Sequence, residues 1–178
     1  MKRLVKGLYV IVDPEAARGR DLVGVTAAAV RGGADAVQLR AKGMGGRALY
    51  ETACALREVC RAGGAVFIVN DRADVAAAAD ADGVHVGQED LPVAQVRRAV
   101  GPGRIVGASA KTVDLAVQAV REGADYLGVG AMFASPTKPG SKTRANSPSG
   151  IPIPESVHTT ATSRLVPSTA ILTCPSFV

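Results

Sequence analysis

The sequence predicts a parallel α/β fold, with a (β/α)8 barrel as the leading architecture and an open doubly wound sheet as the alternative. Short aliphatic segments alternate with Ala-rich amphipathic segments through residues 1–140. The aliphatic segments lack polar alternation, as expected of strands that are covered on both faces. Similar Gly, Ala and Asp turns precede several of them, which is typical of repeated right-handed crossovers.

The elements can be placed in order along the chain. We expect strands at residues 8–12, 36–39, 66–69, 83–86, 105–108 and 126–129. Helices are expected between them at residues 22–31, 46–61, 73–79, 93–100 and 113–121, and Pro92 suits the first turn of the fourth. The recurring turns are Gly33-Ala34-Asp35, Ala81-Asp82-Gly83 and Gly123-Ala124-Asp125. A full barrel needs eight strands and about 200 residues or more, so the pattern predicts a barrel cut to about six strands.

The composition narrows the classes of function. Lys and Arg number 21 against 16 Asp and Glu, giving a net charge of +5, but the cations are scattered. With 3 Phe, 3 Tyr and no Trp, stacking platforms for single-stranded nucleic acid are not expected. Three cysteines without paired spacing indicate a reducing, cytoplasmic setting. No apolar stretch reaches transmembrane length, so we expect no membrane partner. The scattered positive charge favours small anionic ligands, and the few aromatic residues argue against nucleic acid.

Polar residues occur where the expected strands end, which is where functional groups gather in parallel α/β folds. Gln38, Arg40 and Lys42 alternate, so an extended chain places an amide and two cations on one face, which suits a phosphorylated ligand. Asp71 and Asp90 follow two further strands and could hold Mg²⁺ together with substrate phosphates. Other polar residues at strand ends are Asp13, Asn70, Gln88, Ser109, Ser135, Thr137 and Lys138.

Each of these residues also has an ordinary structural explanation. Arg40 and Lys42 could be a solvated loop pair. An isolated aspartate at the place of Asp71 or Asp90 more often caps the helix that follows it. His85 lies within a strand, where a hydrogen-bonded core histidine is expected more often than a base or a ligand. The joint placement of polar residues at the ends of five successive strands favours a site.

Five segments carry a resemblance to a known family. They are residues 8–13, 38–42, 68–76, 82–92 and 123–130, the last followed by Thr137 and Lys138. In order and spacing, the chain resembles the thiamine phosphate synthase family over about residues 4–140. The resemblance implies a (β/α)8 barrel enzyme that transfers an alkyl group. It would join 4-amino-2-methyl-5-hydroxymethylpyrimidine diphosphate to a thiazole phosphate, giving thiamine phosphate and pyrophosphate.

The resemblance also implies roles for individual residues. Asp71 and Asp90 would bind Mg²⁺. The cations that neutralise the departing diphosphate would be Arg40, Lys42 and Lys138. Contacts to the pyrimidine diphosphate would come from Gln38, Leu39, Arg40, Ala41, Lys42, Asn70, Ser109 and Lys138. Contacts to the thiazole phosphate would come from Ser135, Pro136 and Thr137.

The sequence differs from a related isomerase family at one position, and it departs from the synthase family at its far end. Lys111 stands where the related thiazole tautomerases tend to have His, which argues against that isomerase activity, the alternative function. Family members continue beyond Lys138 into a helix and two more strands with Gly-rich ends. Residues 141–178 instead contain 7 Ser, 6 Thr and 5 Pro. We therefore expect a barrel portion over residues 1–140 and an irregular tail over residues 141–178, for which a shifted reading frame is one hypothesis.

A barrel without its last two strands has further consequences. The first and sixth strands would expose unpaired edges, so we expect self-association through them. We also expect little thiamine phosphate formation. A second alternative function is therefore that of a non-catalytic barrel remnant that only binds phosphates.

Overall fold

The computed structural model describes residues 5–130, 159–160 and 169–173 of the chain. Its six parallel strands are β1 (Tyr9–Val12), β2 (Ala36–Leu39), β3 (Val66–Asn70), β4 (Gly83–Val86), β5 (Ile105–Ala110) and β6 (Tyr126–Gly130). The helices are α1 (Pro14–Ala17), α2 (Leu22–Arg31), α3 (Gly46–Gly63), α4 (Ala73–Ala78), α5 (Val93–Val100) and α6 (Val113–Arg121). Among these helices only the short α1 was not predicted; the Asp13 side chain caps it by accepting hydrogen bonds from two backbone amides. No helix in this part of the chain is both long and apolar enough to cross a membrane.

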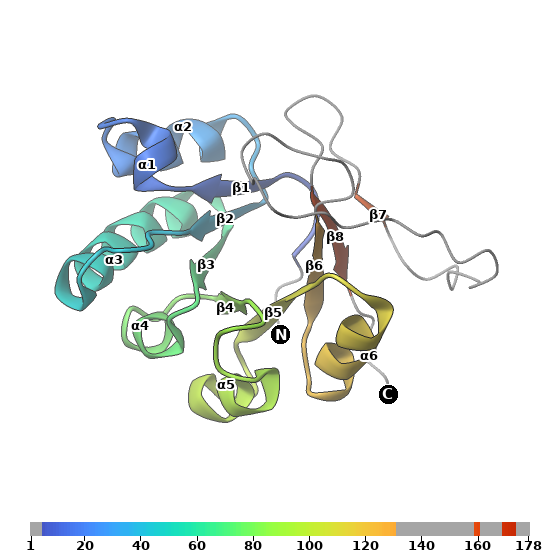
Figure 1. Ribbon diagram of the computed structural model, residues 1–178. Helices are drawn as coiled ribbons and strands as arrows, with labels where there is room; N and C mark the ends of the chain where they lie inside the picture. The colour runs from blue at the N-terminus through green and yellow to red at the C-terminus, as the bar shows by residue number, and fades with distance from the viewer. Residues whose placement is uncertain (1–4, 131–158, 161–168, 174–178) are drawn as a thin grey trace.

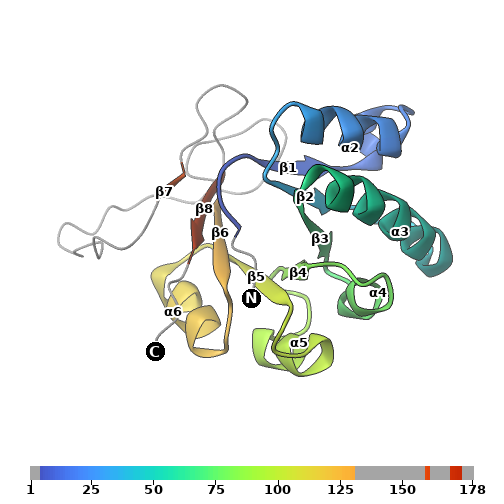
Figure 2. The same cartoon turned by 180° about the vertical axis from the view of Figure 1, so that it is seen from behind.

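The six parallel strands curve into part of a barrel. They lie side by side in chain order, each paired in parallel with the next. Figure 1 and the view from behind in Figure 2 show α2 to α6 around the outside of this curved sheet. In an open doubly wound sheet the strand order would reverse at a switch point, so the sequential order excludes that alternative. The prediction of a (β/α)8 barrel cut to six strands is confirmed.

Alternate residues of each strand supply two separate hydrophobic cores. On the outer side, buried strand residues such as Val37 and Phe67 pack in one cluster with helix residues such as Leu56. A smaller cluster has no helix residues and lines the inner side of the curve; its buried members are Val5, Ala36, Val66, Ile68, Ile105 and Tyr126. Burial on both faces explains why the strands are mostly aliphatic.

The recurring turns place an aspartate at the start of alternate strands. The Oδ2 atoms of Asp35, Asp82 and Asp125 accept hydrogen bonds from the backbone N–H groups of Leu8, Phe67 and Val106, at 2.7, 2.8 and 2.7 Å. Asp35 and Asp125 also donate their own N–H groups back to the carbonyls of Leu8 and Val106. The repeated aspartate is therefore a clamp that ties the start of a strand to its neighbour.

The far end of the chain contributes two short strands that the sequence pattern did not predict. These are β7 (Thr159–Thr160) and β8 (Thr169–Thr173), which lie within the segment expected to be irregular. Strand β8 pairs antiparallel with β6, in the register Leu127↔Leu172. The prediction of an open edge at the sixth strand is therefore wrong. Among the described strands β1 pairs only with β2, which leaves the edge expected at the first strand. The boundary at residues 140–141 lies outside the described residues and stays a prediction.

Candidate binding site at the carboxyl ends of the strands

The polar residues singled out in the sequence meet at one end of the curved sheet. Gln38 is the third residue of β2, Asn70 ends β3, and Ser109 is the fifth residue of β5. Arg40 and Lys42 follow β2 directly, and Asp71 follows β3. Because parallel strands all end at the same edge, the loops after β1 to β5 surround this site (Figure 1).

Arg40 is fixed by an acidic partner on the neighbouring strand end. Its Nη1 lies 2.5 Å from Oδ2 of Asp13, and the two side chains are 35% and 13% exposed. Burial acts to raise the pKa of Asp13, but the hydrogen bonds from Arg40 and from the amides of Glu15 and Ala16 outweigh it, so this pKa is lowered. Arg40 is therefore held in place at the site and is no freely solvated loop cation.

Asp71 occupies a backbone conformation that only a few residue types adopt readily. Its φ is 63°, in the left-handed region, and its amide donates to the carbonyl oxygen of His85 at 2.8 Å. The helix that follows, α4, has Arg72 at its N-cap and receives no side-chain capping bond. The structure thus excludes capping as the explanation of Asp71. Strained backbone of this kind occurs preferentially at functional sites.

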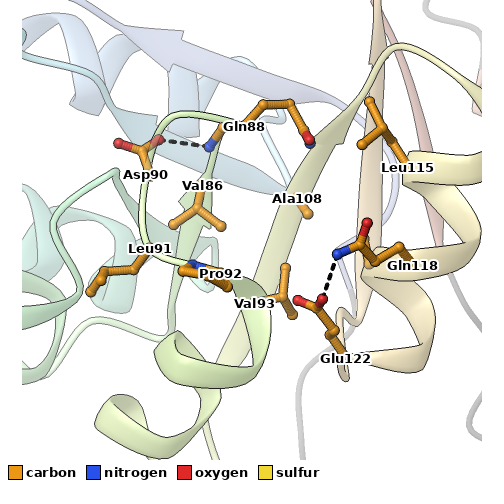
Figure 3. Close-up of a pocket in the computed structure, with 12 residues that line it drawn as sticks. Val86, Gln88, Asp90, Leu91, Pro92, Val93, Ala108, Leu115, Gln118 and Glu122 are labelled. Carbon is orange, nitrogen blue, oxygen red and sulfur yellow. Dashed lines mark hydrogen bonds between the residues drawn. The ribbon is translucent and has the colours of Figure 1, made fainter.

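Asp90 also does not cap the helix that follows it. Its Oδ2 accepts a hydrogen bond of 2.7 Å from the amide of Gly87, within the loop after β4 (Figure 3). Helix α5 has Pro92 at its N-cap and receives no side-chain capping bond. Neither of the two aspartates predicted to act together is therefore a helix cap, which is the usual role of an isolated aspartate at such a position.

The carboxyl groups of Asp71 and Asp90 interact. Burial raises the pKa of Asp71, and the neighbouring carboxyl of Asp90 raises it further, while Lys42 and Arg40 act in the opposite direction. Lys42 Nζ lies 3.8 Å from Oδ2 of Asp71. Two adjacent carboxylates flanked by two cations form an arrangement that a divalent cation and a polyphosphate would complete.

The donor set fits Mg²⁺ in its ordinary protein setting. Mg²⁺ prefers oxygen ligands and commonly uses one or two carboxylates plus substrate phosphates and waters. The described residues contain no group of three or more His, Cys, Asp or Glu side chains suited to a metal. Asp71 and Asp90 would thus supply two ligands and leave the remaining positions to water and phosphate.

The other predicted ligands before residue 130 are placed along the strands. Gln38 is buried, at 3% exposure, while Asn70 and Ser109 are half-buried at the ends of their strands. Leu39 is buried in the outer core, and Ala41 is half-buried in the loop after β2. Ser135, Pro136, Thr137 and Lys138 lie outside the described residues, so the thiazole phosphate half of the predicted site stays a prediction.

One polar cluster at this site was not predicted as a unit. His85 of β4 is hydrogen-bonded through both ring nitrogens: Nε2 lies 3.0 Å from Oγ of Ser109, and Nδ1 lies 3.0 Å from the hydroxyl of Tyr126. Tyr126 in turn lies 2.9 Å from the hydroxyl of Tyr9. Strand alternation could have indicated this cluster from the sequence. In the paired strands His85 lies opposite Asn70 and in the same alternating set as Ser109, so the three side chains share the inner face of the sheet.

A small hollow lies beside the site, between the loop after β4 and helix α6. Its volume is about 140 Å³, and Figure 3 shows Gln88 and Asp90 on one side with Gln118 and Glu122 on the other. Gln118 donates a hydrogen bond of 2.8 Å to Glu122. The carboxylates of Asp90 and Glu122 make this hollow a poor place for a phosphate. The cations Lys42 and Arg40, which act on Asp71, mark a better place for one.

Comparison with known proteins gives one consistent result. The family model for thiamine monophosphate synthase matches residues 8–171. The chain is 53% identical over 132 residues to a thiamine-phosphate synthase from Roseiflexus castenholzii, which covers 74% of this chain and 58% of that protein. It is 48% identical over 139 residues to the enzyme of that name from Caldanaerobacter subterraneus, with coverages of 78% and 65%.

A solved structure agrees. The thiamine phosphate pyrophosphorylase from Pyrococcus furiosus matches with a TM-score of 0.65 and 42% identity, covering 71% of this chain and 60% of that one. The chain therefore spans about three fifths of the length of the relatives that it matches.

Proposed function

Because the chain belongs to the thiamine monophosphate synthase family, we propose that it binds 4-amino-2-methyl-5-hydroxymethylpyrimidine diphosphate and transfers the pyrimidinylmethyl group to a thiazole phosphate. The products are thiamine phosphate and pyrophosphate. The diphosphate is proposed to lie against Arg40, Lys42, Asn70 and Ser109, with Lys138 as a further cation. Gln38, Leu39 and Ala41 are proposed to contact the pyrimidine diphosphate, and Ser135, Pro136 and Thr137 the thiazole phosphate.

We propose Mg²⁺ as the cofactor, held by Asp71 and Asp90. When bound, the ion would neutralise part of the charge of the diphosphate leaving group. The interacting carboxyls of Asp71 and Asp90, and the proximity of Lys42 to Asp71, support this assignment.

The chemistry of the reaction suits these side chains. The bond between the pyrimidine CH2 carbon and the diphosphate oxygen breaks, and its electron pair leaves with the diphosphate. The thiazole nitrogen then supplies the electron pair of the new carbon–nitrogen bond. No protein nucleophile is required, so the contribution of Arg40, Lys42 and Lys138 is to bind and orient the diphosphate and to stabilise its growing charge.

The observation that carries this proposal is that neither Asp71 nor Asp90 caps a helix, while the carboxyl of Asp90 raises the pKa of Asp71 and Lys42 lies 3.8 Å from it. It is tested by calorimetric titration of the full chain with the pyrimidine diphosphate, with Mg²⁺ present and after chelation. We expect binding that weakens strongly without Mg²⁺ and in Asp71→Asn. A matched control is Asp74→Asn, an exposed aspartate three residues away that pairs with Arg72. Equal affinity with and without Mg²⁺ would remove the metal from the proposal.

Assays for turnover separate this function from the two alternatives. Thiamine phosphate formation supports the synthase. Mg²⁺-dependent binding without product would identify a phosphate-binding barrel portion that lacks turnover. A thiazole isomerase needs no diphosphate site, so it would act on thiazole phosphate with no Mg²⁺-dependent binding of the pyrimidine diphosphate.

We propose a cytoplasmic location for this activity. The support is that two cysteines of α3 are packed as small apolar residues, as in proteins of reducing compartments. Cys60 is fully buried in the outer core, and Cys54 is partly buried and packs against that core. Fractionation of cells that express the tagged chain tests this, and recovery in a secreted or membrane fraction would contradict it.

A further inference from the structure

Four polar side chains form a continuous line across the inner side of the curved sheet. Tyr9 of β1, Tyr126 of β6, His85 of β4 and Ser109 of β5 are joined in this order by hydrogen bonds of 2.9, 3.0 and 3.0 Å. The rings of Tyr9 and Tyr126 pack with their centroids 6.0 Å apart, and those of His85 and Tyr126 with theirs 5.4 Å apart. The line begins in the inner core and ends at the hydroxyl of a proposed ligand contact.

Glycines on adjacent strands leave the space that two of these rings occupy. A Cβ atom at Gly107 would lie 2.1 Å from Cζ of Tyr126. A Cβ atom at Gly128 would lie 3.1 Å from Cε1 of His85. A side chain at either position would displace a ring, so both ring positions are built into the sheet.

The available acceptors set the direction in which protons are donated along the line. Burial raises the pKa of both Tyr9 and Tyr126, so both phenols keep their protons. Among the described residues, the hydroxyl of Tyr9 has Tyr126 as its one hydrogen-bond partner. If Tyr126 donated to Tyr9, the proton of Tyr9 would have no acceptor there, which is costly for a partly buried donor that packs against the inner core. Tyr9 therefore donates to Tyr126, and Tyr126 donates to Nδ1 of His85.

This direction fixes the tautomer of the imidazole. With Nδ1 as an acceptor, the neutral ring carries its proton on Nε2 and donates it to Oγ of Ser109. We propose that His85 is a positioning residue, held by Tyr126 as the Nε2–H tautomer, and that it turns the hydroxyl proton of Ser109 toward an acceptor oxygen of the bound ligand. That this oxygen belongs to a diphosphate rests on the proposed function; the tautomer and the direction of donation do not.

Nitrogen-15 NMR of the full chain tests the tautomer directly. The sequence contains two histidines, His85 and His158, so a His158→Gln variant assigns the ring signals. We expect His85 at neutral pH to carry its proton on Nε2, and Tyr126→Phe to raise the Nδ1–H fraction. The matched control is Tyr50→Phe on α3, because Tyr50 is the third tyrosine and is 42% exposed. An Nδ1–H signal in the unaltered chain, or an unchanged tautomer in folded Tyr126→Phe, would overturn the proposal.

A second measurement covers the case in which Tyr126→Phe does not fold. Tyr9→Phe leaves Nδ1 of His85 as the one acceptor for the Tyr126 hydroxyl among the described residues, so we expect the Nε2–H tautomer to persist. A change of tautomer in a folded Tyr9→Phe chain would contradict the direction argued here, because it would show that Tyr126 donates to Tyr9 in the unaltered chain.

Binding of inorganic pyrophosphate with Mg²⁺ tests the role of the Ser109 proton. We expect Ser109→Ala and Tyr126→Phe each to weaken binding about tenfold, as for one hydrogen bond to a charged acceptor. The double variant should bind no more weakly than Ser109→Ala alone, because both changes remove the same donor. Additive losses would overturn the coupling. No pyrophosphate binding by the unaltered chain would instead contradict the proposed function, while the NMR result would still decide the direction of donation.

Discussion

Asp13 and Arg40 join the carboxyl ends of the first two strands through an ion pair with Oδ2 and Nη1 2.5 Å apart. Asp13 also accepts hydrogen bonds from the amides of Glu15 and Ala16 at the start of α1. One carboxylate thus fixes both the turn after β1 and the guanidinium proposed to meet the diphosphate.

Asp13→Ala should destabilise the chain more than the removal of an ordinary capping aspartate. The matched control is Asp21→Ala, because Asp21 caps α2 with two backbone hydrogen bonds and pairs with no arginine among the described residues. Loss of a cap costs about 1 kcal/mol, and the Arg40 pair should add about 0.5 kcal/mol. Urea unfolding at pH 7 measures both values. Equal losses would show that the ion pair contributes nothing to stability.

The contribution of the Asp13 charge should depend on pH in a defined direction. Its pKa is lowered by folding, so its stabilising effect is fully present above the unfolded value of about 3.9. The effect is lost as the pH falls through the lower, folded value. The difference in unfolding free energy between the unaltered chain and Asp13→Asn should therefore be constant from pH 7 to about pH 5 and shrink at more acidic pH. A difference that grows on acidification would contradict this assignment.

Arg40→Ala and Lys42→Ala should each weaken binding of pyrophosphate with Mg²⁺ by about tenfold or more, since each removes a charged hydrogen-bond donor from the site. Arg61→Ala provides the control: this arginine is 73% exposed on α3 and pairs with Glu58. Calorimetry measures all three at one salt concentration. If Arg61→Ala weakened binding as much as the other two, Arg40 and Lys42 would be part of a diffuse positive field and not ligands.

Asp82→Ala should lower the free energy of unfolding by about 1 to 3 kcal/mol, because it leaves the N–H of buried Phe67 without the acceptor at 2.8 Å. Asp114→Ala, at an exposed position in the first turn of α6, should change it by less than about 1 kcal/mol. Chemical denaturation compares the two. A small effect of Asp82→Ala would mean that water replaces the carboxylate at the start of β3.

Ile11→Lys should reduce self-association of the chain. Ile11 is 52% exposed on β1, and β1 has one paired neighbour among the described strands. The carbonyls of Leu8 and Val12 accept hydrogen bonds from the amides of Ala36 and Arg40, on the side of β2. Since successive residues of a strand turn their peptide groups to opposite sides, those of Ile11 point to the unpaired edge. A lysine there is a common device against edge pairing. Sedimentation velocity should show fewer oligomers than for Val23→Lys, at an exposed position of α2. Equal distributions for the two variants would place the association elsewhere.

Most of the described fold could be predicted from the sequence because each strand and helix carries a local signal. Strands β2 and β4 and helix α5, for example, have the same bounds as the predicted elements. Their continuous aliphatic character reflects burial on both faces, as the two cores show. Strand β8 could not be predicted, since its pairing with β6 joins residues that are distant along the chain.

The candidate site was less predictable, because residue type alone leaves several roles open. An aspartate after a strand can cap a helix or face a ligand; the left-handed φ of Asp71 and the Gly87 amide at Asp90 decide this, and both depend on tertiary structure. The sequence places Asp13 at a strand end but predicts no role for it, because its partner Arg40 lies 27 residues away. The line from Tyr9 to Ser109 crosses strands β1, β6, β4 and β5, so no local pattern could reveal it.

The antiparallel attachment of β8 limits how this half-barrel can be extended. Hydrogen bonds from Tyr126↔Thr173 to Gly130↔Thr169 already occupy the free side of β6, with the opposite polarity to the other strands. A further strand running parallel to β6 would need the same backbone groups, so it could join only after β8 separates. A complementing fragment that supplied the rest of a barrel would therefore compete with the chain's own strand. Its association rate should level off at high fragment concentration, at the rate at which β8 detaches.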